Sequence, residues 1–480
     1  MIFQPVLYII GYLLSALSII LCIPAGIDAF YGNNQWQSFT FSSLISLFFG
    51  IILILANKSD NFNISIKQAF LLTTLSWIFI AFFGSLPFIF SNLELSFTDA
   101  FFESMSGITT TGSTILSGLD NLPHGILIWR SLLQWIGGIG IIVIAISFLP
   151  ILKVGGMQLF HTESADSSEK VLPRAGQIAS IIGIIYFVLT MLCALLLWIF
   201  GMSTFDSIAH SMTTLATGGF STSDMSIGKY DNINIEFTIS IFMILGSLPF
   251  VLYLQAIRGN IFAIFKDNQV QFFILLVITS VLIVTFWNYQ NTATFLNNFR
   301  SSFFNTISIF TGTGYTTQDF NNWGSFITIL FLFLMLVGGC AGSTTCGIKI
   351  FRLQILYQSA KIQIFKLLNP HGVSVAKYNK MPVSESISSS VMGYFFMFIV
   401  IYILITLILS FVGNDFLTSL SGAATSLANV GPGLGNVIGP TKTFAALSDT
   451  TKWVLIIGML TGRLELLSVI ILLTPSFWKN

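Results

Sequence analysis

Charged residues are scarce in this chain. Asp, Glu, Lys and Arg make up 8% of its 480 residues, whereas hydrophobic residues make up 54%. A soluble domain carries about 25% charged residues, and apolar runs of about 18 or more residues recur along this sequence. We therefore predict an all-α integral membrane protein. The net charge of +1 leaves no basic surface large enough to neutralise phosphates, which argues against a nucleic-acid partner.

Cysteine and histidine are also few. Cys340 and Cys346 have no nearby histidine or carboxylate to complete a metal site, and we expect buried free thiols at all four cysteines, Cys22, Cys193, Cys340 and Cys346. His210 is expected to be a packing residue. No Ser or Cys stands with any of the four histidines as a nucleophile beside a base. An intramembrane hydrolase is therefore disfavoured, and we predict a protein that is not an enzyme and has no cofactor.

Ten apolar segments are long enough to span a membrane. The first two have no glycine-centred loop between them and are expected to form a hairpin. The N-terminal segment lacks the positive stretch of a secretory signal, so it is expected to remain as a membrane helix. The predicted spans are residues 6–30, 39–56, 69–90, 129–150, 176–200, 235–257, 270–289, 323–357, 387–412 and 453–474.

A short motif occurs four times in variant form between the later spans. It reads TTTGST at 109–114, ATGGFS at 216–221, TGTGYT at 311–316 and NVGPGL at 429–434. Alignment on the first glycine common to all four makes Gly112, Gly218, Gly314 and Gly431 equivalent. Their near-even spacing predicts a helix–loop–helix unit repeated four times around a central pore. The predicted divisions are a hairpin at 1–60 and units at 61–155, 156–260, 261–370 and 371–480.

Each motif follows an amphipathic segment of about a dozen residues that begins with a capping residue, as a short helix does. These segments begin at Thr98-Asp99, Thr204, Arg300-Ser301 and Asn414-Asp415. Non-helical backbone at membrane depth is tolerated only where it lines a cavity or is buried in protein. Four such loops can present carbonyl groups to a cation in place of its hydration shell, and glycine permits the backbone angle this needs. The negative ends of the short helix dipoles would point to the same place.

This pattern closely resembles the Trk/Ktr/HKT superfamily of potassium and sodium transport proteins, nearest to the H-type membrane subunit of the bacterial Trk system. The resemblance rests on four matched loops and covers almost the whole chain. It implies uptake of potassium, the substrate, across the bacterial inner membrane. In this family a serine at the first filter glycine is associated with sodium, and all four positions here are glycine. The implied selectivity filter, where potassium binds, consists of Thr110, Thr111, Gly112, Ala216, Thr217, Gly218, Gly312, Thr313, Gly314, Asn429, Val430 and Gly431.

The second helix of the third unit contains a run too rich in glycine and small polar residues for an uninterrupted helix, GGCAGSTTCG at 338–347. A break there would lie in mid-membrane, where broken helices border cavities. The alternative is close helix packing through small residues. The resemblance implies an intramembrane gate under the filter, made of Gly338, Gly339, Gly342, Ser343, Thr344, Thr345 and Gly347.

Arg463 lies within the last predicted span and is assigned to the same gate. A charge at this depth costs at least about 2.5 to 3.5 kcal/mol and usually turns toward a cavity or a partner. Glu465 is two residues away and does not share its helical face. The resemblance implies that Arg463 faces the permeation path as a positive barrier. Two structural alternatives are a bond with a distant carboxylate and a bond with carbonyls freed at 338–347.

Lys and Arg are distributed unevenly between the two sides of this topology. Most of them fall on the side that carries both termini, which predicts that both termini are cytoplasmic and that the loops enter from outside. Acidic residues on the outer side would raise the local cation concentration. For Asp99, Asp206 and Asp415, which belong to this group, the favoured interpretation is that they are simply helix caps.

The resemblance also implies partners: a second copy of the membrane subunit, and a cytosolic ring of nucleotide-binding regulatory subunits. The chain has no glycine-rich phosphate loop between a strand and a helix, so nucleotide control would come from the partner. A coupled secondary transporter built on inverted repeats is the competing function. The four predicted units run in the same orientation, which counts against it. The leading interpretation is a monovalent cation permease surrounded by membrane lipid, with potassium favoured.

Overall fold

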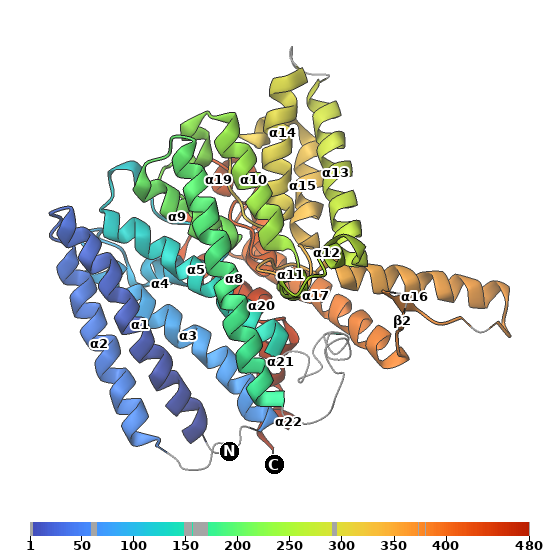
Figure 1. Cartoon of the computed structure of the whole chain (residues 1–480), viewed down its shortest axis with the longest axis horizontal. Coiled ribbons are helices and arrows are strands. Elements are labelled where there is room, and N and C mark those ends of the chain that lie inside the picture. The colour runs from blue at the N-terminus through green and yellow to red at the C-terminus, as the bar shows by residue number, and fades with distance from the viewer. Residues whose placement is uncertain are drawn as a thin grey trace.

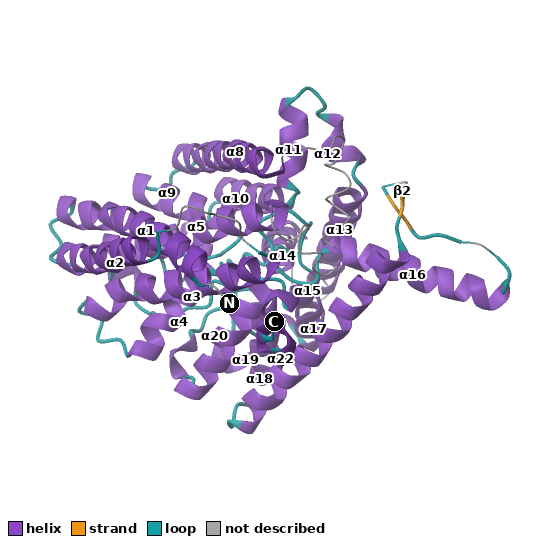
Figure 2. Cartoon of the chain, turned by 90° about the horizontal axis from the view of Figure 1, so that it is seen from below, coloured by secondary structure: helices purple, strands orange, loops and turns teal. Residues whose placement is uncertain are grey.

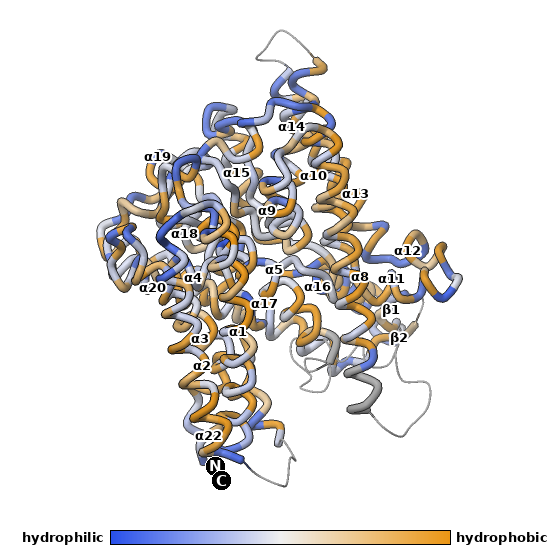
Figure 3. Tube along the Cα trace, turned by 60° about the vertical axis from the view of Figure 1, so that its left-hand side comes forward, coloured by the Kyte–Doolittle hydropathy of each residue, from blue (hydrophilic) through white to orange (hydrophobic). Residues whose placement is uncertain are grey.

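Long apolar helices lie side by side with short helices inserted between them in the computed structural model of this chain (Figure 1). The structure describes residues 3–58, 65–147, 156, 171–289, 295–372, 374–379 and 381–479. The N-terminal hairpin predicted from the sequence is present as α1 (Gln4–Phe30) and α2 (Trp36–Ala56), which pack along each other at one side of the bundle. The two ends of the chain lie near each other in Figures 1 and 3.

The remaining helices follow in an order of long, short and long. Four of the shorter helices each precede one of the four motifs. In chain order the elements are α3 (Ile66–Phe90), α4 (Phe97–Ile108), α5 (His124–Ser147), α8 (Val171–Ile199), α9 (Thr204–Leu215), α10 (Ile233–Ser247), α11 (Phe250–Ile257), α12 (Phe262–Lys266), α13 (Asn268–Tyr289), α14 (Phe295–Phe310), α15 (Ser325–Val337), α16 (Ile350–Leu368), α17 (Glu385–Phe411), α18 (Phe416–Ala428), α19 (Gly435–Ile438), α20 (Asp449–Arg463), α21 (Leu467–Leu473) and α22 (Pro475–Trp478).

Seven single helices of the described residues are long and apolar enough to cross a membrane: α1, α2, α3, α5, α8, α13 and α17. Two bent pairs, α10 with α11 and α20 with α21, bring the number to nine if each pair is one span. The remaining predicted span, residues 323–357, is divided between α15 and α16. Figure 3 shows the long helices as hydrophobic over most of their length. Their outward side chains include Ile19, Phe48 and Leu55, which are 60% or more exposed, as expected where lipid replaces water.

The bends at α10 and α20 were not predicted. The α10–α11 pair turns by 93° and the α20–α21 pair by 117°, so the predicted continuous helices at 235–257 and 453–474 are wrong. Pro249 stands at the first bend, and its missing N–H ends the hydrogen-bond ladder of α10. At the second bend Glu465 and Leu466 have positive φ angles of 58° and 20°, which no helix tolerates.

Capping side chains begin the short helices. Ser96 and Ser203 accept the backbone N–H groups of Asp99 and Asp206 at 3.1 and 3.0 Å, and donate to the carboxylates of the same residues. Asp415 itself caps α18. The cap interpretation is therefore confirmed for Asp415, whereas Asp99 and Asp206 lie in the first turn and bond to the serines that cap their helices. Helix α9 begins at Thr204 as predicted, and α4 begins at Phe97, one residue before the predicted Thr98. The third short helix begins at Phe295, so its predicted start at Arg300-Ser301 is wrong.

Each short helix packs between the two long helices that flank it in sequence: α4 between α3 and α5, α9 between α8 and α10, α14 between α13 and α15, and α18 between α17 and α20. Each also contacts the second long helix of the preceding group. The contacts run from α5 to α9, from α10 to α14, from α15 to α18, and from α20 back to α4. The contacts therefore form a closed cycle.

Helix α16 extends beyond the bundle (Figures 1 and 2). The two short antiparallel strands, β1 (Lys377–Tyr378) and β2 (Met381–Pro382), lie on the segment that follows it. The outer part of α16 carries exposed apolar side chains, including Ile364, Leu367 and Leu368.

All four cysteines are free, as predicted. Three are buried, but Cys22 is exposed on α1, so the prediction of burial is wrong there. No group of three or more His, Cys, Asp or Glu with metal-ligand spacing occurs in the part of the chain that the structure describes.

Candidate ion filter and its supporting shell

The four motifs fold as turns with related backbone geometry at the ends of the short helices. We call them loop one (109–114), loop two (216–221), loop three (311–316) and loop four (429–434). Each has one residue with a left-handed φ at its start: Thr110 (52°), Thr217 (48°), Gly312 (74°) and Asn429 (53°). Two residues later a second left-handed angle occurs in three of the loops, at Gly112 (86°), Gly219 (76°) and Gly314 (82°).

This geometry corrects the sequence alignment of loop two. Gly219, and not Gly218, is equivalent to Gly112, Gly314 and Gly431, since each lies two residues after the first left-handed residue. Burial agrees with this register in the first three loops, where Gly112, Gly219 and Gly314 are partly exposed and Gly218 is buried; in loop four Gly431 is buried. Ala216 is the C-cap residue that follows α9 and is not part of the equivalent triplet. The matched triplets are Thr110-Thr111-Gly112, Thr217-Gly218-Gly219, Gly312-Thr313-Gly314 and Asn429-Val430-Gly431.

The four loops contact one another in a ring. A Cβ on Gly112 would overlap the Gly218 carbonyl oxygen, and a Cβ on Gly219 would overlap the Thr313 carbonyl oxygen. On Gly314 it would lie 3.1 Å from the Gly431 Cα. On Gly431 it would lie 3.3 Å from the Thr111 carbonyl oxygen, which closes the ring. Contacts this close leave little room for any residue with a side chain, and the positive φ angles independently favour glycine at three of the positions.

Loops one and four are also joined by side chains. Ser113 Oγ donates to the Gly431 carbonyl oxygen at 2.7 Å. Asn429 Nδ2 donates to Thr111 Oγ1 at 2.9 Å and to the Met459 carbonyl oxygen of α20 at 3.0 Å. Asn429 therefore connects both loops to the helix that ends at Arg463.

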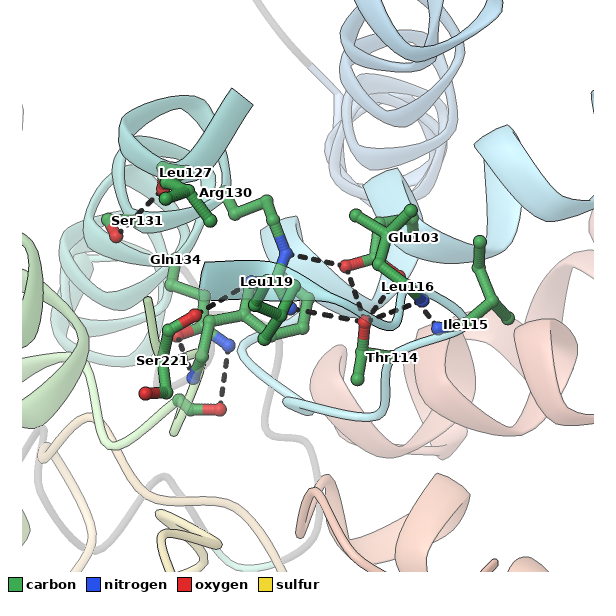
Figure 4. A network of polar contacts seen from close by, with 12 residues as sticks. Glu103, Thr114, Ile115, Leu116, Leu119, Leu127, Arg130, Ser131, Gln134 and Ser221 are labelled. Carbon is green, nitrogen blue, oxygen red and sulfur yellow. Dashed lines mark hydrogen bonds and ion pairs between the residues drawn. The ribbon is translucent and has the colours of Figure 1, made fainter. Parts of the chain in front are cut away.

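A buried ion pair supports loops one and two from behind (Figure 4). Arg130 Nε donates to Glu103 Oε1 at 2.7 Å, with both side chains 1% exposed or less. Glu103 also accepts from Thr114 Oγ1 and from the Ile115 N–H, which are both in or next to loop one. Arg130 NH1 donates to the Ser221 carbonyl oxygen of loop two at 2.8 Å. The pair thus holds the two loops to α4 and α5.

His210 and Tyr315 join loops two and three. His210 is buried as predicted, with Nδ1 2.8 Å from the Asp206 carbonyl oxygen and Nε2 3.0 Å from Ser221 Oγ. The Tyr315 hydroxyl of loop three contacts the Thr213 hydroxyl on α9 and lies 3.3 Å from the His210 carbonyl oxygen. Loop three is therefore anchored on the short helix that precedes loop two.

Several acids predicted to line the outer side are buried instead. Asp28 and Glu103 are fully buried, and Glu236 is 6% exposed and paired with Arg300 at 2.8 Å. Arg130 lies within α5 and is also buried. Asp120 does lie in a connection after loop one. Partial burial alone would raise its pKa, but hydrogen bonds from Lys229 and Ser223 outweigh this and lower the pKa of Asp120 below its usual range.

The break predicted at 338–347 is present between α15 and α16, and the loop at 338–349 is buried throughout. Its backbone bonds to the bend of α10. The N–H groups of Cys340 and Thr344 donate to the carbonyl oxygens of Ser247 and Gly246 at 3.1 and 3.2 Å, and the Phe250 N–H donates to Gly342 at 2.9 Å. The α15–α16 loop and the α10–α11 bend thus satisfy each other's backbone N–H and C=O groups, as buried non-helical backbone requires.

Arg463 bonds to this α15–α16 loop. Its NH1 group donates to the Thr344 carbonyl oxygen at 2.8 Å and to Cys346 Sγ at 2.9 Å, and NH2 donates to the Gly137 carbonyl oxygen of α5 at 2.9 Å. The alternative in which Arg463 bonds a carbonyl freed by the break is therefore the one observed. The same loop contacts loop two, because Thr217 Oγ1 lies 3.1 Å from Thr344 Oγ1.

The far end of the α15–α16 loop carries a second buried charge cluster. Glu465 pairs with Lys349 at 3.1 Å and with Arg352 at 2.5 Å, and all three side chains are less than 5% exposed. Glu465 has left its helix at the α20 bend, which lets it reach residues more than a hundred positions away in sequence. This cluster fixes the start of α16 against the end of α20.

Sequence reasoning missed three supporting residues. Gly219 was missed because the alignment used the first of the two consecutive glycines, Gly218. Pro249 inside an apolar span was a signal for the bend. Gln134, a polar residue in the middle of an apolar helix, was a signal for a buried partner, and its amide bonds the backbone of loop two.

Comparison with known proteins places this geometry in a family. A profile for TrkH, described as a cation transport protein, matches residues 35–479. This chain belongs to the TrkH family. It is 43% identical to the Trk system potassium uptake protein TrkI of Halomonas elongata, over 99% of this chain and 97% of that protein. It is 37% identical to TrkH of Escherichia coli K12 over the full length of both.

A solved TrkH structure has the same fold. The crystal structure of the potassium transporter TrkH from Vibrio parahaemolyticus superimposes with a TM-score of 0.93, at 35% identity and over the whole of both chains. As a TrkH family member this chain is a transmembrane transport protein and not an enzyme.

Proposed function

We propose that this chain takes up potassium across the bacterial inner membrane through a selectivity filter formed by loops one to four. The observation that carries the proposal is the closed ring of loops, each placed at the end of a short helix and each in contact with the next. Such loops can replace the hydration shell of a cation with backbone carbonyl groups. The relatives named above are potassium uptake proteins, which supports potassium as the substrate.

The architecture we propose is four helix–loop–helix units around one pore, with the α1–α2 hairpin outside them. The cyclic packing of α4, α9, α14 and α18 supports it. Ten spans follow if α15 and α16 are taken as one broken span beside the nine candidates. Both termini then face the cytoplasm, and the four loops enter from outside.

The α15–α16 loop is proposed as a gate beneath the filter. Its support is direct contact with loop two through Thr217 and Thr344, together with the bond between Arg463 and the Thr344 carbonyl oxygen. In the conformation observed, Arg463 holds this loop against α5. Opening would require the Arg463 bonds to break and the α15–α16 loop to leave the bend of α10.

Partners are proposed from the resemblance and from one feature of the surface. The projecting α16 carries exposed apolar side chains at Ile364, Leu367 and Leu368, which fit a second copy of the chain. A cytosolic ring of nucleotide-binding subunits is proposed as the regulator. Purification in detergent with light scattering would measure whether the membrane subunit is a dimer.

The decisive test is ion flux from purified protein in liposomes, in potassium and in sodium gradients, with and without a pH gradient. Serine variants of Gly112, Gly219, Gly314 and Gly431 are each expected to lower the ratio of potassium to sodium flux, because a side chain and hydroxyl enter the ring of carbonyls. Gly393→Ser on α17 is the matched control, since a Cβ there meets nothing within 4 Å. An unchanged ratio in all four folded variants would reject the filter.

A further inference from the structure

Gln134 bonds the backbone of loop two on both sides of its ring glycine. It is fully buried on α5, one helical turn after Arg130 (Figure 4). Its Nε2 donates to the Gly218 carbonyl oxygen at 2.6 Å, and its Oε1 accepts the Phe220 N–H at 3.0 Å. Both ends of one amide therefore bond backbone groups on the two sides of Gly219.

The contact with Gln134 explains why residue 218 is a glycine. A Cβ on Gly218 would overlap the Gln134 side-chain amide, with Nε2 only 2.8 Å away. The two consecutive glycines of loop two thus have different physical reasons. Gly219 has the left-handed angle of the ring, and Gly218 makes room for Gln134.

The Gly218 carbonyl differs from its three equivalents. In the matched register it corresponds to the carbonyls of Thr111, Thr313 and Val430. Among the described residues no hydrogen bond reaches the carbonyl oxygens of those three, whereas Gly218 accepts a short bond from a neutral amide. A hydrogen bond draws electron density from an oxygen and restrains its direction, so this oxygen is a weaker and less mobile cation ligand than the others.

We propose that Gln134 is a specificity-determining residue, which sets the strength and position of one carbonyl ligand in the filter. The proposal rests on the assignment of loops one to four as the filter. Without the Gln134 donor the Gly218 oxygen would attract a cation more strongly and would move more freely. Both changes favour the smaller sodium ion relative to potassium. Sodium costs more to dehydrate, and a more strongly attracting or closer oxygen offsets more of that cost.

The anchoring of loop two does not depend on Gln134 alone. Arg130 NH1 still donates to the Ser221 carbonyl oxygen at 2.8 Å, and the Arg130 guanidinium lies over the Phe220 ring with its Cζ 4.1 Å from the centroid. A variant at Gln134 is therefore expected to fold with loop two in place. What it loses is the donor to Gly218 and the acceptor for Phe220.

The test compares Gln134→Met and Gln134→Glu with the wild type in the liposome flux assay. Methionine keeps the unbranched shape but can neither donate nor accept strongly. Glutamate keeps the acceptor for Phe220 and, when ionised, places a negatively charged oxygen where the donor to Gly218 stood. Each variant is expected to lower the ratio of potassium to sodium flux about three- to tenfold, the effect of losing one net hydrogen bond. Ser131→Ala is the control on the same helix, since its hydroxyl bonds only the Leu127 carbonyl oxygen of α5 and the ratio should stay unchanged.

The outcomes separate this inference from the filter itself. A lowered ratio in either folded Gln134 variant, with Ser131→Ala unchanged, supports the inference. An unchanged ratio in the Gln134 variants, together with a lowered ratio in Gly219→Ser, overturns the role of Gln134 and leaves the filter standing. If Gly219→Ser and the other serine variants also keep the wild-type ratio, the filter assignment fails. Loss of folding in both Gln134 variants would assign the residue a structural role and would overturn the inference as well.

Discussion

Arg463→Ala tests the proposed gate most directly. Arg463 is 1% exposed, and its two terminal nitrogens join the Thr344 carbonyl oxygen of the α15–α16 loop to the Gly137 carbonyl oxygen of α5. Alanine removes both bonds and the positive charge. The bond from Arg463 to Cys346 Sγ is lost as well, so the α15–α16 loop loses both of its described bonds to Arg463, and we expect it to leave the path more often.

The size of the effect follows from these contacts. A hydrogen bond from a charged donor contributes about 1.5 to 3 kcal/mol, so loss of the Thr344 bond is expected to raise the equilibrium constant for opening about 10- to 150-fold. The two carbonyl groups left without this donor cost about 1 to 3 kcal/mol each, so the melting temperature should fall. Lysine is expected to be intermediate, because an ammonium group is a compact point charge without the planar fork that reaches both carbonyls.

The assay is potassium flux per folded molecule, measured beside the melting temperature of the same preparation. Arg258→Ala is the control, because Arg258 is exposed at the end of α11 and should leave both quantities near the wild-type values. Faster flux with a lowered melting temperature supports a latch that must open. Flux at or below the wild-type rate in a destabilised but folded variant would refute the reasoning, and Arg463 would then be structural.

Two further changes test the supporting shell. Glu103→Gln leaves Arg130 buried without a charged partner, and we expect a loss of about 3 to 5 kcal/mol of stability, measured as a lower melting temperature. The control Glu94→Gln, in an exposed connection, should leave the melting temperature unchanged. Equal melting temperatures for the two variants would contradict the role of the buried pair. Asp120 has a pKa lowered by Lys229 and Ser223, so its contribution is present above the ordinary aspartate pKa of about 3.9 and is lost as the pH falls through the lower folded value. Asp120→Asn should therefore cost a little stability at neutral pH and show a weaker decline in acid, and a variant with the same acid profile as the wild type would contradict this assignment. The expected cost is small, at most about 1 kcal/mol, because both Asp120 and Lys229 are partly exposed.

The sequence alone determined the class of the protein and the position of its special segments. Apolar run length predicts membrane helices because the bilayer thickness sets their length, and that holds without knowledge of neighbours. The four motifs and the break at 338–347 are equally local, since glycine and small polar residues lower helix propensity wherever they occur. The α1–α2 hairpin and the break between α15 and α16 are both found where the sequence predicts them.

Only the tertiary structure decided which residues of these segments contact one another. In loop two the sequence offers two adjacent glycines, and only the folded backbone shows that Gly219 belongs to the ring, through its left-handed φ and its contact with the Thr313 carbonyl oxygen. Gly218 is explained by Gln134, more than eighty residues earlier in the chain. The bend at Glu465 likewise depends on Lys349 and Arg352, which bind its carboxylate from another helix. Partners of buried polar groups are chosen by distance in space, and a single sequence records only distance along the chain. For the same reason the bond from Arg463 to Thr344 could be named as an alternative from the sequence, but only the packing of α20 against the α15–α16 loop selects it.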